Sequence, residues 1–223
     1  MDGVFITFEG IEGAGKTTQS RILCEALTAE GFPCLLTSEP GGTPLGNMIK
    51  NILTNTQYND MTPLAELFLF SASRAQHVEC IIRPSLEEGK IVICDRYSDA
   101  SIAYQSFGRG LPLNLVYETN STASWNVRPD ITFFVDVEPA KGLSRVSNRL
   151  QELEIPADRI EKENLEFFER VREGYHYVSR EEPIRVRILD GNLGVQELHK
   201  IVLDIIHKEL IKRKFKKGLL FNP

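Results

Sequence analysis

The chain has 223 residues, with 26 lysines and arginines against 31 aspartates and glutamates, so its formal net charge is −5. Hydrophobic residues make up 42% of the chain and charged residues 26%, which excludes a disordered, collagen-like or disulfide-scaffold protein. Because an α/β chain of this length buries one large core, we expect a single domain over residues 1–223.

The first half of the chain alternates predicted strands and helices. Short apolar runs rich in β-branched residues predict strands over residues 4–8, 34–37 and 91–94. A helix is predicted after residue 16 by the apolar stripe of Ile22, Leu23, Ala26 and Leu27. Thr62 and Pro63 form an N-cap followed by a first-turn proline, and they open a long helix that we expect Pro84 to end.

The second half repeats this alternation. Strands are predicted over residues 131–135 and 184–189, and helices over 163–180 and from 195 to about 217. Residues 184–189 alternate apolar and basic side chains, which is typical of a strand near a sheet edge. The fold class is therefore α/β, a five-stranded parallel sheet with helices on both faces, in which ligands bind at the carboxyl ends of the strands.

The last predicted helix ends in a basic segment. Residues 207–223 have a net charge of 6 − 1 = +5, from Lys208, Lys212, Arg213, Lys214, Lys216 and Lys217 against Glu209. We favour a solvated helix end over residues 207–217 rather than contact with phosphates or anionic lipid. The first 206 residues carry the remaining −10, so we expect no nucleic-acid partner and no membrane partner.

The cysteines and the termini favour a cytoplasmic protein. The four cysteines show neither CxxC nor zinc-site spacing, and we expect all of them to be buried, reduced thiols: Cys24, Cys34, Cys80 and Cys94. Only three residues precede the first strand, so we expect no signal peptide. No stretch approaches the roughly 18 apolar residues that a membrane span requires.

The strand at 4–8 runs directly into GIEGAGKT over residues 10–17, which fits the phosphate-loop pattern GxxxxGK[ST]. Its glycines allow backbone N–H groups to point at a phosphate, and the helix N-terminus adds partial positive charge. Lys16 can reach the β- and γ-phosphates, and Thr17 can offer its hydroxyl to Mg²⁺. The predicted nucleotide site comprises Gly10, Ile11, Glu12, Gly13, Ala14, Gly15, Lys16, Thr17 and Thr18.

The phosphate loop does not by itself identify the reaction. The sequence has neither the DxxG and [NT]KxD motifs of regulatory GTPases nor an LSGGQ signature. Asp95 and Arg96 follow the third strand, where a carboxylate can hold Mg²⁺ through water and a guanidinium can bind a second phosphate. The alternative is a local ion pair at the strand end.

A base-binding pocket is a further possibility on the helix that begins at Pro63. Phe70 and Arg74 lie four residues apart and share one helix face, where an aromatic ring and a guanidinium can hold a nucleobase. By spacing alone, a position in the hydrophobic core is the favoured interpretation of Phe68 and Phe70.

Seven blocks, in order, resemble bacterial thymidylate kinases. They are FEGIEGAGKTT (8–18), EPGGT (39–43), LFSASR (69–74), DRY (95–97), AYQ (103–105), GRG (108–110) and DRIE (158–161). The resemblance extends from about residue 4 to residue 191. It implies a P-loop nucleoside-monophosphate kinase fold and a homodimer that, with Mg²⁺, transfers a phosphoryl group from ATP to dTMP, giving dTDP for dTTP synthesis.

The resemblance also implies roles for residues near the thymidine. Phe70 would stack on thymine, Arg74 would bond its 4-carbonyl, and Ser101 would lie near N3. Tyr104 would lie beneath the sugar 2′ carbon and exclude ribonucleotides, and Glu12 would reach the 3′-hydroxyl.

Other roles implied by the resemblance concern the phosphates. Arg96 would bind the dTMP phosphate, and Glu39 with Asp95 would organise the metal and its waters. The remaining implied site residues are Gln105 on the substrate side, Pro40, Gly41 and Gly42 under the sugar, and Asp190, Gly191 and Asn192 on the adenine side.

The expected lid, about residues 145–161, departs from the family pattern in its length and arginine content. The phosphate loop carries no arginine. The resemblance to the bacterial type implies that a lid arginine instead covers the transferring phosphoryl group. Arg145 and Arg149 share one helix face, and Arg159 is a third possibility. We predict Arg149, which together with Lys16, Asp95 and Arg96 makes up the predicted catalytic set.

Two other functions stay open. A deoxynucleoside kinase would need a carboxylate base, and Glu39 could serve as one. A P-loop regulatory module would need only the nucleotide site. The four histidines form no apparent triad, and we interpret them as structural or surface residues: His77, His176, His199 and His207.

Overall fold

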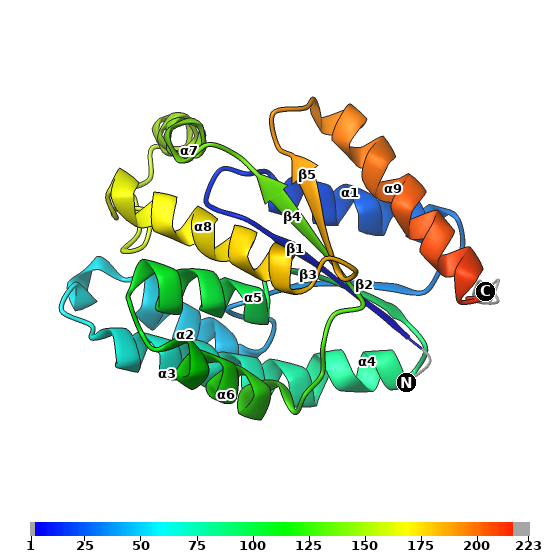
Figure 1. The fold of residues 1–223 in the computed structure, drawn as a ribbon, viewed down its shortest axis with the longest axis horizontal. Coiled ribbons are helices and arrows are strands. Elements are labelled where there is room, and N and C mark those ends of the chain that lie inside the picture. The colour runs from blue at the N-terminus through cyan, green and yellow to red at the C-terminus, as the bar shows by residue number, and fades with distance from the viewer. Residues whose placement is uncertain (1–2, 216–223) are drawn as a thin grey trace.

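The structure, a computed structural model, describes residues 3–215 and contains the expected parallel sheet. Its strands are β1 (Val4–Glu9), β2 (Cys34–Ser38), β3 (Ile91–Asp95), β4 (Ile131–Asp136) and β5 (Val186–Asp190). Within the described residues their order is β2-β3-β1-β4-β5, and every neighbouring pair is parallel (Figure 1). The predicted five-stranded sheet is confirmed.

The last strand lies at the sheet edge, as its alternating pattern predicted, but it begins at Val186 rather than at residue 184. Pro183 and Ile184 instead belong to a turn that is closed by a hydrogen bond from the Arg185 N–H to the Glu182 carbonyl. Ile184 is 85% exposed, so its side chain contributes nothing to the core.

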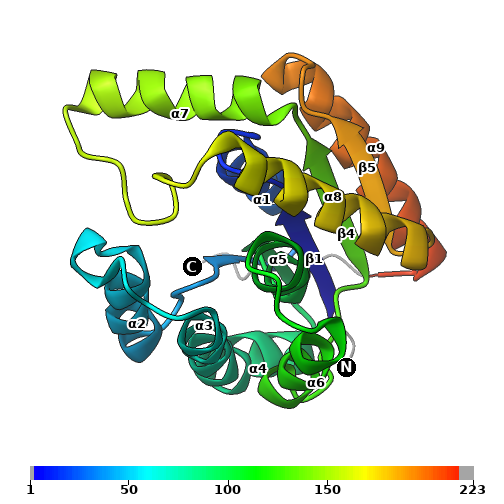
Figure 2. The same ribbon diagram turned by 60° about the vertical axis from the view of Figure 1, so that its left-hand side comes forward.

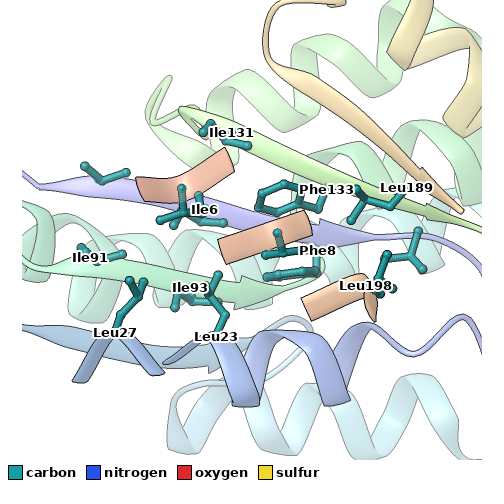
Figure 3. Close-up of a cluster of buried hydrophobic side chains, with 14 of the residues drawn as sticks. Ile6, Phe8, Leu23, Leu27, Ile91, Ile93, Ile131, Phe133, Leu189 and Leu198 are labelled. Atoms are coloured by element: carbon teal, nitrogen blue, oxygen red, sulfur yellow. The ribbon is translucent and has the colours of Figure 1, made fainter. Parts of the chain in front are cut away.

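One face of the sheet packs against α1 (Lys16–Ala29) and α9 (Val195–Lys212). Alternate residues of β1, among them Ile6 and Phe8, point to this face and meet Leu23 and Leu27 of α1 and Leu198 of α9 (Figure 3). Because α1 begins at the end of the phosphate loop, this contact fixes the loop against the sheet.

The opposite face is covered by α8 (Leu165–Glu181), α3 (Pro63–His77), α5 (Ser98–Ser101), η3 (Ile102–Gly108) and α6 (Leu113–Ser124). Phe134 of β4 packs there with Phe168 and Val171 of α8 and with Ile102. On the same face, Phe5 of β1 packs against Val78 and Ile82 in the segment that follows α3.

The prediction that Pro84 ends the long helix is wrong. After α3 the chain continues through a π-helical segment, η2 (Val78–Ile82), into the short helix α4 (Arg83–Glu87). Pro84 lies in the first turn of α4, directly after the π-helical segment. The N-cap prediction is confirmed, since the Thr62 side chain accepts a hydrogen bond from the Ala65 N–H.

Four helical segments had not been predicted: α2 (Pro44–Thr54), α5, η3 and α6. The helix α7 (Pro139–Leu153), which follows the fourth strand, carries Arg145 and Arg149 on the face they were expected to share. A short turn, η1 (Thr56–Tyr58), follows α2.

The C-terminal helix ends earlier than predicted. α9 stops at Lys212 rather than near residue 217, because Lys214 adopts a left-handed conformation and Phe215 turns back to pack near Phe32. The cations up to residue 214 lie on the surface, where Lys208 pairs with Asp204, which agrees with the solvated helix end. Lys216 and Lys217 lie outside the described residues.

The cysteine prediction is correct in part. All four are free thiols, but Cys80 is exposed because its face of η2 points to solvent, and only Cys94 is fully buried; Cys24 and Cys34 are half-buried. Between residues 3 and 215, no helix is both long and apolar enough to cross a membrane.

Candidate active site

A cavity of about 690 Å³ opens where the parallel strands end. Its walls come from the phosphate loop after β1, from residues that follow β2 and β3, and from α2, α3, η3, α7 and the loop after α7. Figure 2 shows α7 and the loop after it on one side of this region, with α2 and α3 on the other. Cavities of about 300–1,000 Å³ are typical of small-molecule sites.

The phosphate loop has the backbone geometry that its sequence predicted. Gly13 and Gly15 have φ values of 72° and 98°, which L side chains rarely adopt. A Cβ on Gly13 would also lie 2.2 Å from the Gly142 carbonyl oxygen of α7, so the loop can pass α7 only with glycine at this position.

Lys16 and Thr17 begin α1 and line the cavity. The Lys16 ammonium donates to the Ile11 carbonyl at 2.7 Å, and burial, together with the charge of Arg96, lowers the pKa of Lys16 to about 8. The Thr17 hydroxyl donates to the Asp95 carboxylate, so the two predicted metal ligands are adjacent.

Six of the nine predicted nucleotide-loop residues line the cavity: Glu12, Gly13, Gly15, Lys16, Thr17 and Thr18. The other three residues do not line the cavity: Gly10, Ile11 and Ala14. Ile11 and Ala14 are almost fully buried in the two hydrophobic clusters on either face of the sheet.

Arg96 links the end of β3 to the phosphate loop. Its guanidinium donates to the Gly10 carbonyl at 2.8 Å, to the Glu12 carboxylate at 2.8 Å and to the Tyr104 hydroxyl at 3.1 Å. The Tyr104 hydroxyl in turn donates to Glu12 at 2.5 Å. Three predicted substrate residues from β3, η3 and the phosphate loop therefore form one cluster on the cavity wall.

Arg74 lies at the α3 side of the cavity and is almost completely buried. Its guanidinium donates to Glu39 at 2.7 Å, to Ser101 at 3.0 Å, to Asn120 at 2.7 Å and to the Tyr97 carbonyl at 3.1 Å. Since a guanidinium has five N–H donors and these contacts use four, one donor remains.

Phe70 and Gln105 complete this side. Phe70 is half-buried and lines the cavity one helical turn before Arg74, whereas its neighbour Phe68 is 53% exposed and lies outside the cavity lining. The core alternative for Phe68 is therefore wrong, and Phe70 is not fully buried in the core.

Glu39 follows β2, and both of its carboxylate oxygens are engaged. One oxygen accepts from Arg74, and the other lies 3.1 Å from the His77 Nδ1 atom. His77 is fully buried and also contacts the Thr37 hydroxyl at 2.6 Å. None of the four histidines lines the cavity, in agreement with their structural interpretation.

The three arginines of the predicted lid differ in their surroundings. Arg145 donates to the Gly13 carbonyl at 3.2 Å and to the Gly191 carbonyl at 3.1 Å, so the turn after β5 lies beside the phosphate loop. Arg149 is half-exposed and pairs with Glu161 at 2.6 Å. Both line the cavity, whereas Arg159 is buried beside Leu53 and does not.

Several wall residues were not predicted from the sequence. They include Lys50, Leu53 and Thr54 of α2, and Asp158 and Ile160 of the loop between α7 and α8, residues 154–164, here called the lid loop. A signal for α2 was present, because Thr43 caps the Gly46 N–H at 2.9 Å and Pro44 follows it in the first turn. Asp158 and Ile160 belong to the DRIE block, but no local pattern indicates that they face the cavity, because their position depends on contacts with distant helices.

The phosphate loop and Arg96 face one cavity, so a phosphate donor and a phosphorylated acceptor can bind side by side. Together with the doubly covered parallel sheet, this arrangement defines a P-loop nucleotide kinase, an α/β phosphotransferase.

Comparisons with known proteins narrow this class. The sequence profile of the family described as thymidylate kinase matches residues 8–202. A thymidylate kinase of Geobacter sulfurreducens is 42% identical over 212 residues, covering 95% of this chain and 100% of that protein. One from Chlorobaculum parvum is 45% identical over 210 residues, covering 91% and 95%.

A solved structure gives the same result. The crystal structure of a thymidylate kinase from Ehrlichia chaffeensis matches this chain with a TM-score of 0.72 and 36% identity, covering 92% of this chain and 98% of that one. The chain therefore belongs to the thymidylate kinase family. The family resemblance and the P-loop kinase fold predicted from the sequence are confirmed.

Proposed function

We propose that this protein transfers the γ-phosphoryl group of ATP to dTMP and releases dTDP and ADP, a step of dTTP synthesis. The observation that carries this proposal is a single cavity lined both by the phosphate loop and by Phe70, Arg74 and Ser101. Membership in the thymidylate kinase family supports dTMP as the acceptor.

At the acceptor end, thymine stacks on Phe70 and accepts the remaining Arg74 donor at its 4-carbonyl. Ser101 lies 3.0 Å from Arg74, which supports its assignment beside thymine N3. Tyr104 and Glu12 border the sugar, with the Tyr104 ring excluding a 2′-hydroxyl. Gln105 lines the same wall.

At the donor end, the backbone of residues 10–18 cradles the ATP phosphates, and Asp190, Gly191 and Asn192 lie on the adenine side. The hydrogen bonds of Arg145 to both segments support this placement. Pro40, Gly41 and Gly42 shape the loop under the sugar of the acceptor.

The reaction needs alignment and charge neutralisation rather than a general base. The phosphate oxygen of dTMP is ionised at neutral pH and is itself the nucleophile. Lys16 and Arg96 neutralise charge on the two phosphate groups, and Arg149 meets the transferring phosphoryl group from the lid. The half-exposed pairing of Arg149 with Glu161 supports a side chain that is free to move toward the cavity.

Mg²⁺ fits the donor set at the phosphate loop. The Thr17 hydroxyl and the Asp95 carboxylate are adjacent hard oxygen ligands, the kind Mg²⁺ uses together with substrate phosphates. Within residues 3–215 no cluster of three or more His, Cys, Asp or Glu side chains could hold a metal alone. When bound, Mg²⁺ would neutralise the charge that develops on the ATP phosphates. The metal role of Glu39 stays a prediction, since both its oxygens contact protein groups.

A deoxynucleoside kinase is less well supported. That reaction requires a free carboxylate to accept a proton from the sugar 5′-hydroxyl. The Glu39 carboxylate is buried and bonded to Arg74 and His77, so it is poorly suited to that task. A purely regulatory module would not require the acceptor side of the cavity around Phe70.

We further propose that residues 1–223 form one kinase domain with a lid at about 145–161, acting as a cytoplasmic homodimer. The homodimer rests on the family resemblance, and the exposed side chains of Met48, Leu64 and Phe68 on α2 and α3 are compatible with it. Sedimentation equilibrium that gives the monomer mass at micromolar concentration would refute it.

The function is tested by measuring ADP release with dTMP, thymidine or no acceptor, at saturating ATP and Mg²⁺. We expect turnover with dTMP only, and dTDP as the product. Turnover with thymidine alone would favour the deoxynucleoside kinase, and equal ATP hydrolysis in all three mixtures would refute a nucleotide kinase.

A further inference from the structure

Two motifs of the chain, GRG (108–110) and DRIE (158–161), have no place in the proposed chemistry, yet their arginines meet at one side chain. Glu66 of α3 accepts from Arg109 at 3.1 Å on each oxygen and from Arg159 at 2.6 Å. It also accepts from the Gln105 amide at 3.0 Å. None of Glu66, Arg109 and Arg159 lines the cavity.

The Glu66 carboxylate is almost completely shielded from solvent, with 1% of the residue exposed. Burial opposes its ionisation, but the hydrogen bonds and charges of Arg109, Gln105 and Arg159 hold the pKa of Glu66 below its usual value. Glu66 is therefore an anion with four hydrogen bonds, the arrangement in which a buried charge fixes the position of its partners.

Two partners of Glu66 connect it to different walls of the cavity. Gln105 is itself a wall residue of η3. Arg159 lies between Asp158 and Ile160, which line the cavity from the lid loop.

Arg159 also ties the lid loop to α2. Its side chain donates to the Leu53 carbonyl at 2.8 Å, and its backbone N–H donates to the Thr54 carbonyl at 3.0 Å. Leu53 and Thr54 are cavity-lining residues. Arg109, in turn, pairs with Glu163 at 2.5 Å, where the lid loop leads into α8.

We propose that Glu66 is a positioning residue that sets the acceptor side of the cavity by holding η3, α2 and the base of the lid loop at fixed separations. It touches no substrate and acts through Arg159, Arg109 and Gln105. Phe70 lies one helical turn after Glu66 on α3, so the same anchor fixes the proposed thymine platform relative to these walls.

The kinetic effect expected from this proposal rests on the proposed function. The phosphate loop is held by β1 and α1, whereas the hydrogen bonds of the Glu66 carboxylate go to Gln105, Arg109 and Arg159. Loss of the anchor should therefore alter the acceptor side and leave the ATP side intact. A displacement of about 1 Å in a positioned group costs on the order of a hundredfold in rate. Loosened walls therefore raise KM for dTMP and lower kcat, with KM for ATP unchanged.

The test compares three variants with the wild type: Glu66→Gln, Arg159→Gln and the double variant. Glu66→Gln keeps the size and shape of the side chain but removes its negative charge. We expect KM for dTMP to rise at least about tenfold and KM for ATP to change less than about twofold. Because the two residues share one ion pair, the rise in KM for dTMP in the double variant should be smaller than the product of the two single rises.

Arg185→Gln is the matched control for destabilisation. Arg185 precedes β5, at the amino end of the sheet, and its removal leaves the buried Asp99 carboxylate without its cation at 2.7 Å. We expect the melting temperature to fall as it does for Glu66→Gln, while both KM values remain those of the wild type.

Hydrogen–deuterium exchange provides a readout that does not depend on turnover. In Glu66→Gln, amides 158–163 should exchange faster than in the wild type and in Arg185→Gln. Unchanged exchange, or equal changes in the two KM values, would overturn the proposal and reduce Glu66 to a general stabilising residue. If the wild type does not phosphorylate dTMP, the proposed function fails, and the exchange result still decides the role of Glu66.

Discussion

Arg96 adopts a left-handed backbone conformation with φ of 71°, which costs a residue with a bulky side chain on the order of 1 kcal/mol. A hydrogen bond from its backbone N–H to the Phe8 carbonyl at 2.9 Å and the side-chain contacts with Gly10 and Glu12 offset this cost. The strained backbone turns the guanidinium toward the phosphate loop rather than away from it. The sequence indicated Arg96 by its place after an apolar strand, but not this conformation.

Phe70→Ala should raise KM for dTMP about 5- to 150-fold, because one base-stacking contact is worth about 1–3 kcal/mol, and leave KM for ATP unchanged. Phe68→Ala is the matched control, since Phe68 lies on the same helix outside the cavity lining. Steady-state kinetics with each substrate varied decide the outcome. An equal rise in both KM values would show that Phe70 supports the fold rather than the base.

Tyr104→Ala should lower the preference for dTMP over the ribose analogue of the same base, because the ring is expected to fill the space of a 2′-hydroxyl. Tyr104→Phe keeps the ring and loses only the hydrogen bonds to Glu12 and Arg96, so it should retain the preference. The measured quantity is the ratio of the two kcat/KM values. A ratio unchanged in Tyr104→Ala would remove this residue from the sugar site.

Glu66 should make the stability of the protein depend on pH. Its folded-state pKa lies below the ordinary value of 4.5, so its contribution is complete above the unfolded-state pKa and is lost as pH falls through the folded-state pKa. The free energy of unfolding should therefore differ most between wild type and Glu66→Gln above about pH 5 and converge in acid. Urea unfolding at a series of pH values measures this difference; a constant difference would contradict the lowered pKa.

At the scale of elements, local patterns predicted the strands and α1, α3, α8 and α9, because each buries an apolar face of regular period. The continuation through η2 was missed, because no local sequence pattern indicates that a π-helical segment carries the helix past Pro84. The contact between the lid loop and α3 was not predicted for a different reason. Arg159 and Glu66 lie 93 residues apart in the sequence, and a periodic pattern indicates only contacts between nearby residues.

The lid itself gives a prediction about its three arginines. Arg149→Ala should lower kcat by at least about a hundredfold, with ground-state binding of dTMP little changed, because Arg149 is expected to contact the phosphoryl group only during transfer. Arg145→Ala should mainly raise KM for ATP, since Arg145 holds the Gly13 and Gly191 carbonyls. Arg159→Ala should weaken the anchor at Glu66 and lower the melting temperature.

These three variants are compared at saturating ATP and dTMP. A larger loss of kcat at Arg145 than at Arg149 would reassign the phosphoryl contact to Arg145. No loss at either would leave Lys16 and Arg96 as the only arginine or lysine contacts in the transfer step.

At the scale of the whole molecule, the parallel sheet brings residues from distant parts of the sequence to one edge. Glu12, Glu39 and Arg96 follow β1, β2 and β3, and the sheet order places these strand ends side by side. The sequence predicted that ligands bind at this edge, because the predicted parallel strands and the phosphate loop all end there. It did not predict how completely Glu39 and Arg74 would be paired, since pairing depends on tertiary contacts between α3, α6 and the loop after β2.

If both nucleotides occupy one cavity, the phosphoryl group passes directly from ATP to dTMP. Initial rates measured over a grid of ATP and dTMP concentrations test this direct transfer. We expect double-reciprocal lines that intersect, because both substrates must be bound before transfer. Parallel lines would indicate a phosphorylated enzyme intermediate and separate binding events, and would contradict it.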